Sequence, residues 1–303
     1  MRRYTLRQLD TFIEVARQQS ISRAAAVLHV SQPAVSMQLR QLEDIFGMPL
    51  YEQVGRSIAL TAAGRDALEH AQAALARLRG LDDAMASRRG IRKGRIALAM
   101  VSTAKYFVPM LLVLFRKKFP DIEITLQIHN RENIMRLLML NEVDLVIMGR
   151  APESIDCVAT AFATNPLGVI CAPEHPLSRR RNAPLAILDD QVFVVRETGS
   201  GTRQAMERLF GEHGIRPRIA MEMPSNETIK QAVMAGMGMS FLSLRTIRQE
   251  LASGHLVLVD IQGLPVVRHW HITHLAAKRL SPAAGAFKDF LIEEAASLIT
   301  SWA

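Results

Sequence analysis

The sequence predicts an α + α/β protein, in which a small helical domain is joined by a long helix to a two-part α/β domain. Three observations lead to this prediction. Two helical patterns meet abruptly at residues 29–31, one apolar stripe continues from residue 62 to about residue 88, and strand-like and helix-like segments alternate after residue 94. The three patterns are typical of a helix-turn-helix, a long packed helix and a β-α-β fold, respectively.

The composition is that of a soluble globular chain of two or three domains. The 303 residues are 49% hydrophobic and 22% charged, which is usual for this class. The N-terminus MRRYTLRQLD lacks the pattern of a signal peptide, and no apolar run approaches the roughly 20 residues that span a bilayer. The absence of such a run predicts no membrane partner. Because there are only 2 cysteines, we expect a reducing, cytoplasmic location.

The net charge of +8 is concentrated in the first 150 residues, whereas the remainder is balanced. This excess fits contact with an anionic partner, but a solvated basic surface would give the same composition. Charge alone therefore does not identify the partner.

The first three helices are marked by apolar stripes and by their boundary residues. Apolar residues recur at spacings of three and four in 6–16 and again in 35–46. Between these stripes lies a short helical segment, SRAAAVLH, with a serine placed to cap it. Ser31 is a good N-cap residue, and Pro33 falls in the first turn of the next helix, where a missing N–H costs nothing. The segment VSQP therefore ends one helix and starts another.

The outward side of the third helix is the first candidate site. The short turn sets this helix at a steep angle to the second, so its first turns can enter a DNA major groove. Gln, Ser and Arg side chains there can hydrogen-bond base edges, while backbone N–H groups of the turn can bind phosphate. The predicted DNA-binding residues are Ser31, Gln32, Pro33, Ser36, Met37 and Arg40, with Arg56 of the following hairpin.

A hairpin and a long helix follow. Gly47 is typical of a helix C-terminus, and the segments PLYEQ and SIALT bracket a turn, which predicts a wing with Arg56 at its tip. The long helix predicts dimerisation, since no element of the first domain is long enough to cover its stripe; a helix lying on its own domain is the alternative. The stripe consists of Leu68, Ala71, Leu75, Leu78 and Met85.

Strands and helices alternate in the rest of the chain. The glycine-interrupted, basic segment SRRGIRKGR is the expected hinge. In the first set, the strands RIALAM, EITLQI and VDLVIMG alternate with helices over about 107–119 and 132–140. In the second set, the strands are LGVICAP, QVFVVRE, RIAMEM and GMSFLS, and the helices lie over about 202–213 and 227–235. The order predicts a parallel sheet with helices on both faces. A late strand, VRHWHITHLA, and a closing helix return the chain to the first half, which predicts a cleft.

Three polar loops are expected at the carboxyl ends of these strands, where ligands bind in open α/β sheets. Residues 101–103, 197–203 and 225–228 each lead into a helix, whose N-terminus carries unpaired N–H groups and partial positive charge. Because basic residues occupy matching positions, we predict a small anionic effector; the alternative is that these residues only cap helices. The predicted effector-binding residues are Ser102, Thr103, Lys105, Arg131, Arg150, Glu197, Ser200, Thr202, Arg203, Asn226, Glu227 and Thr228.

Other motifs give weaker signals. Cys157 and Cys171 lie in apolar runs and are expected to be buried small hydrophobes, with a redox switch as the alternative. GMGMS at 236–240 follows a helix and precedes a strand, the reverse of a dinucleotide site, so it indicates a helix end and a turn. The three histidines of VRHWHITHLA lack a fourth ligand nearby. GSGT is not a nucleophile elbow. We therefore expect no metal, no cofactor and no catalysis.

The most specific pattern is LRQLDTFIEVARQQSISRAAAVLHVSQPAVSMQLRQLEDIFGMPLYEQ, followed by LTAAGR after the hairpin. A lone helix-turn-helix pattern is weak, but this one stands in fixed register with a wing and a long helix, and it closely resembles the LysR-type transcriptional regulators. The family usually has Phe and Arg where this chain has Tyr51 and Gln53. The loss of that Arg leaves Arg56 as the better candidate for a phosphate contact from the wing.

The resemblance runs the full length and implies a C-terminal effector domain folded like a periplasmic binding protein. The expected domains are a winged helix-turn-helix (1–61), a dimerising linker helix (62–90) and an effector domain (91–303), whose subdomain I is about 91–161 and 267–303 and subdomain II about 162–266. The family implies binding of double-stranded promoter DNA by a homodimer and homotetramer, a dimer of dimers that bends the DNA, with RNA polymerase as a further partner.

Further segments resemble the branch of this family that regulates Calvin-cycle carbon fixation operons. They are VSTAKYFVP, NRENIMRLL, DLVIMGR, RETGSGTR, SNETIKQAVMAGMGMSFLSL and AKRLSPA. This resemblance implies control of RuBisCO genes and an effector that is a phosphorylated metabolite or NADPH. The alternatives are regulation of another metabolic operon and, from other classes, a transport-type binding protein, which would need a secretory signal, or an enzyme, which would need an acid-base pair.

Overall fold

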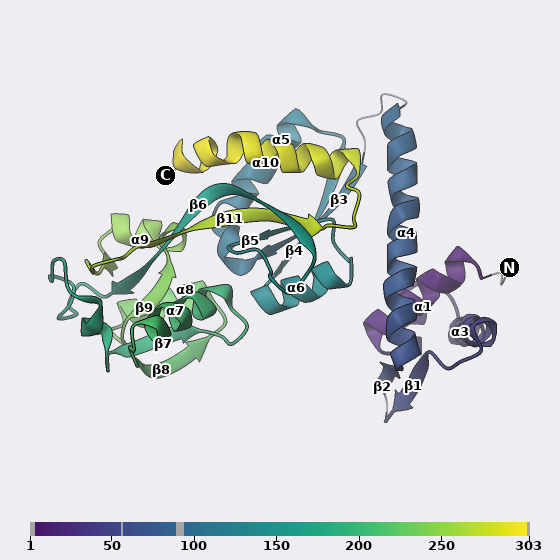
Figure 1. The fold of residues 1–303 in the computed structure, drawn as a ribbon, viewed down its shortest axis with the longest axis horizontal. Coiled ribbons are helices and arrows are strands. Elements are labelled where there is room, and N and C mark those ends of the chain that lie inside the picture. Colours follow the sequence, from purple (N-terminus) through teal and green to yellow (C-terminus); the bar gives the residue numbers. More distant parts are fainter. Residues whose placement is uncertain (1–3, 56, 89–93, 302–303) are drawn as a thin grey trace. The chain divides into compact units, whose positions relative to one another are not determined.

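The computed structural model describes residues 4–55, 57–88 and 94–301 (Figure 1). The chain forms two compact units: the first runs to Met85, and the second holds almost all of the remaining residues. Each unit has a hydrophobic core of its own. The predicted domain limits at residues 61 and 90, and the limits of the two subdomains, stay predictions.

The first unit begins with three helices, α1 (Leu6–Gln18), α2 (Ile21–Val27) and α3 (Gln32–Phe46). A capping box formed by Thr5 and Gln8 starts α1, and the Ser20 side chain caps α2. Gly47 ends α3 at φ 73°, a conformation that glycine adopts without strain. The apolar stripes predicted from the sequence form one core, which contains Phe12, Ala24, Ala25, Val35, Leu39 and Leu42.

The turn between α2 and α3 is short, as predicted. The residues between Val27 and Gln32 include His29 at φ 53°, in the left-handed region. Ser31 is the N-cap residue of α3, as predicted, and its backbone is extended, but its side chain makes no cap hydrogen bond. Pro33 in the first turn has no N–H to satisfy, so the helix starts there with one fewer orphan donor.

The wing and the long helix complete the first unit. Strands β1 (Tyr51–Val54) and β2 (Ser57–Leu60) pair antiparallel, and the Ile58 N–H donates to the Gln19 carbonyl at 3.0 Å, which joins the wing to the end of α1. The following helix, α4, spans Ala62–Arg88.

The apolar stripe of α4 has two parts. Leu68, Ala71 and Leu75 are buried in the core of the first unit, so for them the alternative of a helix lying on its own domain is correct. Leu78 and Leu81 are 39% and 54% exposed. The side chain of Met85, the last member of the predicted stripe, lies outside the described residues. Only the later part of the stripe is therefore open to a partner.

The second unit is built on one mixed sheet, in the order β10-β6-β11-β5-β3-β4, with β9 also paired to β6 (Figure 1). Its strands are β3 (Gly94–Val101), β4 (Ile122–His129), β5 (Leu145–Met148), β6 (Cys157–Cys171), β9 (Ser240–Ser243), β10 (Val257–Leu258) and β11 (Val266–Leu275). Strands β3, β4 and β5 are parallel, as predicted.

The expectation of a purely parallel sheet is wrong, because β6 and β11 run antiparallel to each other along their whole paired length. The sequence reading treated the two ends of β6 as separate apolar runs and did not join them across Thr164, Asn165 and Pro166. These three residues belong to the ladder, since each lies opposite a residue of β11. The two long strands pass through both halves of the unit (Figure 1).

Helices cover both faces of the β3-β4-β5 part of the sheet. Side chains of successive strand residues point to opposite faces, so Leu98 packs with α5 (Val108–Lys118) and α10 (Pro282–Ser301), whereas Ala99 packs with α6 (Arg131–Met139). In Figure 1, α5 and α10 lie together on one side of this part of the sheet and α6 on the other. This region corresponds to the predicted subdomain I.

The region of the predicted subdomain II repeats this arrangement on a smaller scale. Strands β7 (Val192–Arg196) and β8 (Arg218–Met223) are parallel. Phe193 packs with α7 (Gly201–Glu212), and Val194 packs with α8 (Asn226–Met234). A short helix, α9 (Arg248–Ala252), and three 3₁₀ segments complete the described fold; they are η1 (Ser102–Tyr106), η2 (Leu185–Leu188) and η3 (Leu244–Thr246).

Candidate functional site

The outer face of α3 is polar and exposed. Five of the predicted DNA-binding residues are exposed and the sixth, Ser36, is half-buried; the five are Ser31, Gln32, Pro33, Met37 and Arg40. The opposite face holds Val35 and Leu39, which are 0% and 1% exposed. The helix therefore presents hydrogen-bonding side chains outward from a fixed apolar support. Arg56, the predicted phosphate contact of the wing, lies outside the described residues.

Polar contacts fix the orientation of α3. Gln8 of α1 donates to the Gln41 amide oxygen at 3.0 Å, and the Thr11 hydroxyl donates to the Gln38 amide oxygen at 2.5 Å. Both bonds join α3 to α1. An anchored helix loses little conformational freedom when it binds, which favours specific recognition.

The second candidate site is a pocket in the effector unit, with about 430 Å³ of empty space including the part open to solvent. It brings together six of the predicted effector-binding residues, from the end of β3, the start of α6, the end of β5 and the start of α7: Ser102, Thr103, Arg131, Arg150, Ser200 and Thr202. Sequence reasoning missed Asn130, Asn165, Leu167, Arg196, Arg268 and Trp270, which also line it.

A close approach of two loops shapes this pocket. Gly199 has φ 87°, and a Cβ added there would lie 2.5 Å from Glu132 Oε2. The Glu132 N–H also donates to the Gly199 carbonyl at 3.2 Å. The loop before α7 therefore reaches the first turn of α6 only because residue 199 is glycine.

Three arginines at the pocket are close enough to repel one another. Burial, followed by the charge of Arg150, lowers the pKa of Arg131; burial, followed by the charges of Arg131 and Arg150, lowers the pKa of Arg268. Arg150 pairs with Glu153. Within residues 94–301, neither Arg131 nor Arg268 has a carboxylate at ion-pair distance. Their guanidinium groups donate instead to the carbonyls of Arg150, at 2.6 Å, and Gly201, at 3.4 Å.

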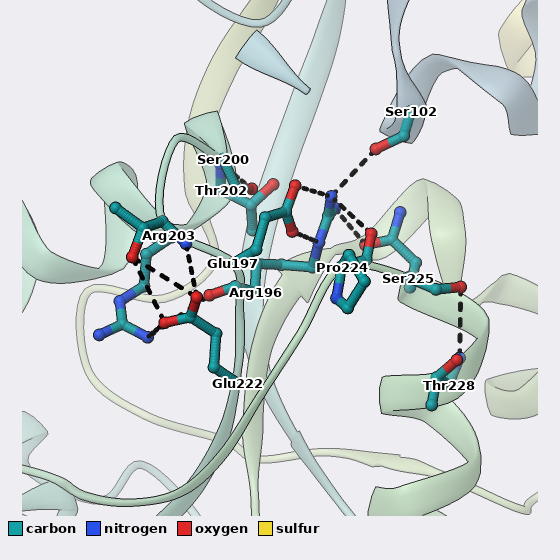
Figure 2. A network of polar contacts seen from close by, with 12 residues as sticks. Ser102, Arg196, Glu197, Ser200, Thr202, Arg203, Glu222, Pro224, Ser225 and Thr228 are labelled. Atoms are coloured by element: carbon teal, nitrogen blue, oxygen red, sulfur yellow. Dashed lines mark hydrogen bonds and ion pairs between the residues drawn. The ribbon is translucent and has the colours of Figure 1, made fainter. Parts of the chain in front are cut away.

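Arg196 has the opposite environment (Figure 2). It is 3% exposed, and its guanidinium forms an ion pair with Glu197 at 2.8 Å. It also donates to Asn226 Oδ1 at 2.6 Å, to the Ser102 hydroxyl at 3.0 Å and to the Pro224 carbonyl at 3.3 Å. These acceptors come from the segments that follow β3 and β8. Arg196 therefore joins two of the three polar loops predicted from the sequence, at residues 101–103 and 225–228.

Six predicted effector-binding residues do not line the pocket. Glu197 and Asn226 are partners of Arg196, as described above. Arg203 pairs with Glu207 at 2.5 Å and with Glu222 at 3.9 Å. Thr228 lies in the first turn of α8, where its N–H donates to Ser225. Ser225 caps α8, and Ser200, which also lines the pocket, caps α7 by accepting from the Thr202 N–H.

Lys105 and Glu227, the last two of these six, belong to a charged cluster between η1 and α8. Lys105 lies 3.8 Å from Glu227, and the Tyr106 hydroxyl donates to the same carboxylate. The ammonium group of Lys230, which is 3% exposed, lies 2.9 Å from Glu227 and 2.8 Å from Glu250.

This cluster changes the acidity of its members. Burial raises the pKa of Glu227, but hydrogen bonds from Tyr106 and Lys230 and the two lysine charges outweigh it, so the net pKa is lowered. Burial, together with the bond to Glu227, raises the pKa of Tyr106. The cluster therefore holds a carboxylate and a protonated phenol across the two halves of the unit.

The two cysteines and the glycines of 236–240 line neither site. Burial raises the pKa of Cys171 to about 11, which fits an inert thiol. Gly236 and Gly238 have positive φ after α8, as expected of a helix end and turn. Among the described residues, no group of three or more His, Cys, Asp or Glu could hold a metal ion. None of the described helices combines the length and apolar composition needed to cross a bilayer.

Comparison with known protein families identifies the family of the chain that carries these two sites. Residues 6–65 match the family described as bacterial regulatory helix-turn-helix protein, lysR family, and residues 89–296 match the LysR substrate binding domain. The second match alone covers more than half of the chain. The chain belongs to the LysR family. The predicted fold class and the prediction of a LysR-type regulator rather than an enzyme are therefore confirmed.

This LysR-family chain is similar throughout to a "RuBisCO operon transcriptional regulator" of Allochromatium vinosum, with 46% identity over 97% of each chain. The CcmR regulatory domain of Synechocystis PCC6803, solved in complex with 2-PG, is 44% identical, covers 66% of this chain and 96% of its own, and gives a TM-score of 0.64. Full-length CbnR complexed with its target DNA is 25% identical over 95% of this chain and 98% of its own, with a TM-score of 0.54.

Proposed function

We propose that this protein is a transcription regulator that binds promoter DNA and controls carbon fixation genes, including those of RuBisCO, in response to a small anionic metabolite. Carbon fixation is supported by the 46% identity to the RuBisCO operon regulator over 97% of each chain. We further propose that the protein acts in the cytoplasm, where promoter DNA is accessible.

The observation that carries the effector proposal is the arginine pocket. Arg131 and Arg268 are partly buried and lie near Arg150. Within the described residues, their hydrogen-bond acceptors are carbonyls, apart from a long contact between Arg131 and Met148. Burying like charges together is costly, so the pocket is electrostatically complete only with an anion in it. The CcmR regulatory domain, which is 44% identical, was solved with 2-PG, and we propose a ligand of this size and charge here.

The DNA-binding proposal rests on the exposed face of α3. Arg40 and Gln32 are exposed on a helix that Gln8 and Thr11 anchor, and such side chains can read base edges in the major groove. We propose that Arg56 of the wing contacts phosphate. Full-length CbnR, which is 25% identical over 95% of this chain, was solved with its target DNA.

Assembly is part of the proposal. Leu78 and Leu81 of α4 are exposed leucines at a spacing of three on one helix, and a second copy of the helix would cover them. We propose a dimer through α4, a dimer of dimers through the effector units, and contact with RNA polymerase from the DNA-bound tetramer. Effector binding would favour one of two arrangements of the predicted subdomains and so change the DNA bend.

The test uses the full-length protein and duplex DNA from the region upstream of its own gene. Fluorescence anisotropy should show specific binding at physiological salt, and calorimetry should show 2-PG binding that Arg268→Met strongly weakens. Arg181→Met is the matched control, because Arg181 is an exposed arginine outside the pocket. A protein that is monomeric and indifferent to this DNA would contradict the regulator proposal. Unchanged 2-PG binding by Arg268→Met would contradict the effector site.

A further inference from the structure

A second cavity adjoins the arginine pocket. It has about 640 Å³ of empty space, including the part open to solvent. Four residues line both cavities, namely Arg150, Leu167, Gly201 and Arg268. The two spaces are therefore neighbours that share a wall, and two of the four arginines of the first pocket, Arg150 and Arg268, lie in that wall.

The walls of the second cavity are largely apolar. One wall is a single face of α7, since residues at spacings of one, four, five and eight lie on one side of a helix. The residues of this face are Gln204, Ala205, Arg208, Leu209 and Glu212. The opposite wall is formed by Leu167 of β6, Phe241 of β9 and Val266 of β11. A flat apolar group between them would be covered on two sides.

Charged residues are distributed unevenly between the two ends of the second cavity. At the inner end, Arg150 and Arg268 are half-buried, and Arg268 has no carboxylate at ion-pair distance within the described part of the unit. At the outer end, Arg208 and Glu212 are exposed and carry opposite charges. The cavity therefore attracts an anionic group at the shared wall and gives no net attraction to a second one at its mouth.

We infer that the effector site accepts a two-part ligand: an anionic head held by Arg131, Arg150 and Arg268, and an apolar, ring-sized body in the second cavity. The inference rests on the proposed function, because the head uses the arginine pocket. It adds the class of the ligand, an organic phosphate or carboxylate with an apolar substituent. A small anion such as 2-PG would leave the second cavity to water.

Calorimetry on the full-length protein with inorganic phosphate, 2-PG and 1-naphthyl phosphate tests this inference. Because the naphthyl group would leave water for apolar walls, we expect 1-naphthyl phosphate to bind at least about ten times more tightly than phosphate. Ala205→Phe fills the second cavity from α7, and Ala205 itself does not line the first cavity. It should reduce the naphthyl phosphate affinity to that of phosphate and leave the phosphate and 2-PG affinities unchanged.

Gly211→Phe is the matched control, since a Cβ at Gly211 of α7 meets nothing within 4 Å and the residue lines neither cavity. It should change none of the three affinities. If Ala205→Phe fails to fold, Val266→Phe fills the same space from β11. If phosphate and 2-PG both fail to bind, the anion site of the proposed function is wrong. If they bind but 1-naphthyl phosphate binds no more tightly, or Ala205→Phe and Val266→Phe leave its affinity unchanged, the two-part ligand is wrong.

Discussion

Two groups of arginines in the effector unit differ in what surrounds them. Arg196 is 3% exposed and has a carboxylate, an amide oxygen, a hydroxyl and a carbonyl as acceptors. Arg131 and Arg268 are also partly buried, yet no carboxylate pairs with either within residues 94–301, and each lies near other arginines. Arg196 therefore completes the protein's own structure, whereas the other two are arranged for an outside anion.

Arg196 thus carries a charge that serves the fold, whereas Arg131 and Arg268 carry charges that serve ligand binding. A buried charge whose acceptors all come from the chain stabilises the folded state, and removing it leaves those acceptors unsatisfied. A cluster of like charges destabilises the free protein and gains from a ligand of opposite charge. The two groups should therefore respond oppositely to substitution.

The largest expected effect is the loss of Arg196. Arg196→Ala leaves Glu197, Asn226 and Ser102 without their shared donor, which should lower the free energy of unfolding of the effector unit by about 3–5 kcal/mol. Urea unfolding followed by circular dichroism measures this change, with Arg181→Ala as the control. A loss below about 1 kcal/mol would place Arg196 in the same group as Arg268.

The second largest effect is expected for Arg268, whose loss should lower ligand affinity and not stability. Arg268→Met should weaken 2-PG binding by about 100-fold, because a charge-assisted contact to the anion is lost. In the absence of ligand, its stability should stay within about 0.5 kcal/mol of the wild type or rise, since repulsion from Arg131 and Arg150 is relieved. Calorimetry and urea unfolding together measure both quantities. A variant that loses stability as Arg196→Ala does would remove the distinction between the two groups.

The exposed face of α3 resembles Arg131 and Arg268 in having side chains that are proposed to bind an outside partner, here DNA. Arg40→Ala and Gln32→Ala should each cost about 1–3 kcal/mol of binding to the cognate site and relax sequence preference. Arg56→Ala should instead weaken all sequences alike and flatten the salt dependence. Anisotropy titrations on cognate and scrambled duplexes distinguish these outcomes. Unchanged affinity and footprints for Arg40→Ala would mean that another face of α3 meets the DNA.

The smallest effect concerns Glu227, which resembles Arg196 in having partners but is more exposed. Its net pKa is lowered, so the unfolded chain binds its proton more readily and the stabilisation is present above the unfolded value of about 4.3. That contribution is lost as the pH falls through the lowered pKa of the folded state. The difference in melting temperature between wild type and Glu227→Gln should be about 1–2 °C near pH 6 and vanish below the lowered pKa. A difference that does not change with pH would exclude the carboxylate as its origin.

The helices and parallel strands were predictable from the sequence because their signals are local. The stripes of α1 and α3, the glycine after α3 and the alternation of β3 to β5 all depend on neighbouring residues. The antiparallel course of β6 and β11 was missed, since Asn165 and Pro166 look like a turn and are held in the ladder only by β11. Pairing between distant segments leaves no local signal.

The candidate effector site was only half predictable for the same reason. Ser102, Arg131 and Ser200 sit at strand or helix ends that the pattern indicates. Arg268 lies inside a strand, away from the strand and helix ends at which ligand contacts were expected. Arg203 was chosen because it starts a helix, yet Glu207 and Glu222 neutralise it.

The continuous course of β6 and β11 determines how the effector unit can deform. The register of this pair shifts between Trp270 and His271, next to the pocket wall that Trp270 and Arg268 form. The proposed rearrangement of the two halves would therefore have to bend or twist these two strands, because both continue from one half into the other (Figure 1).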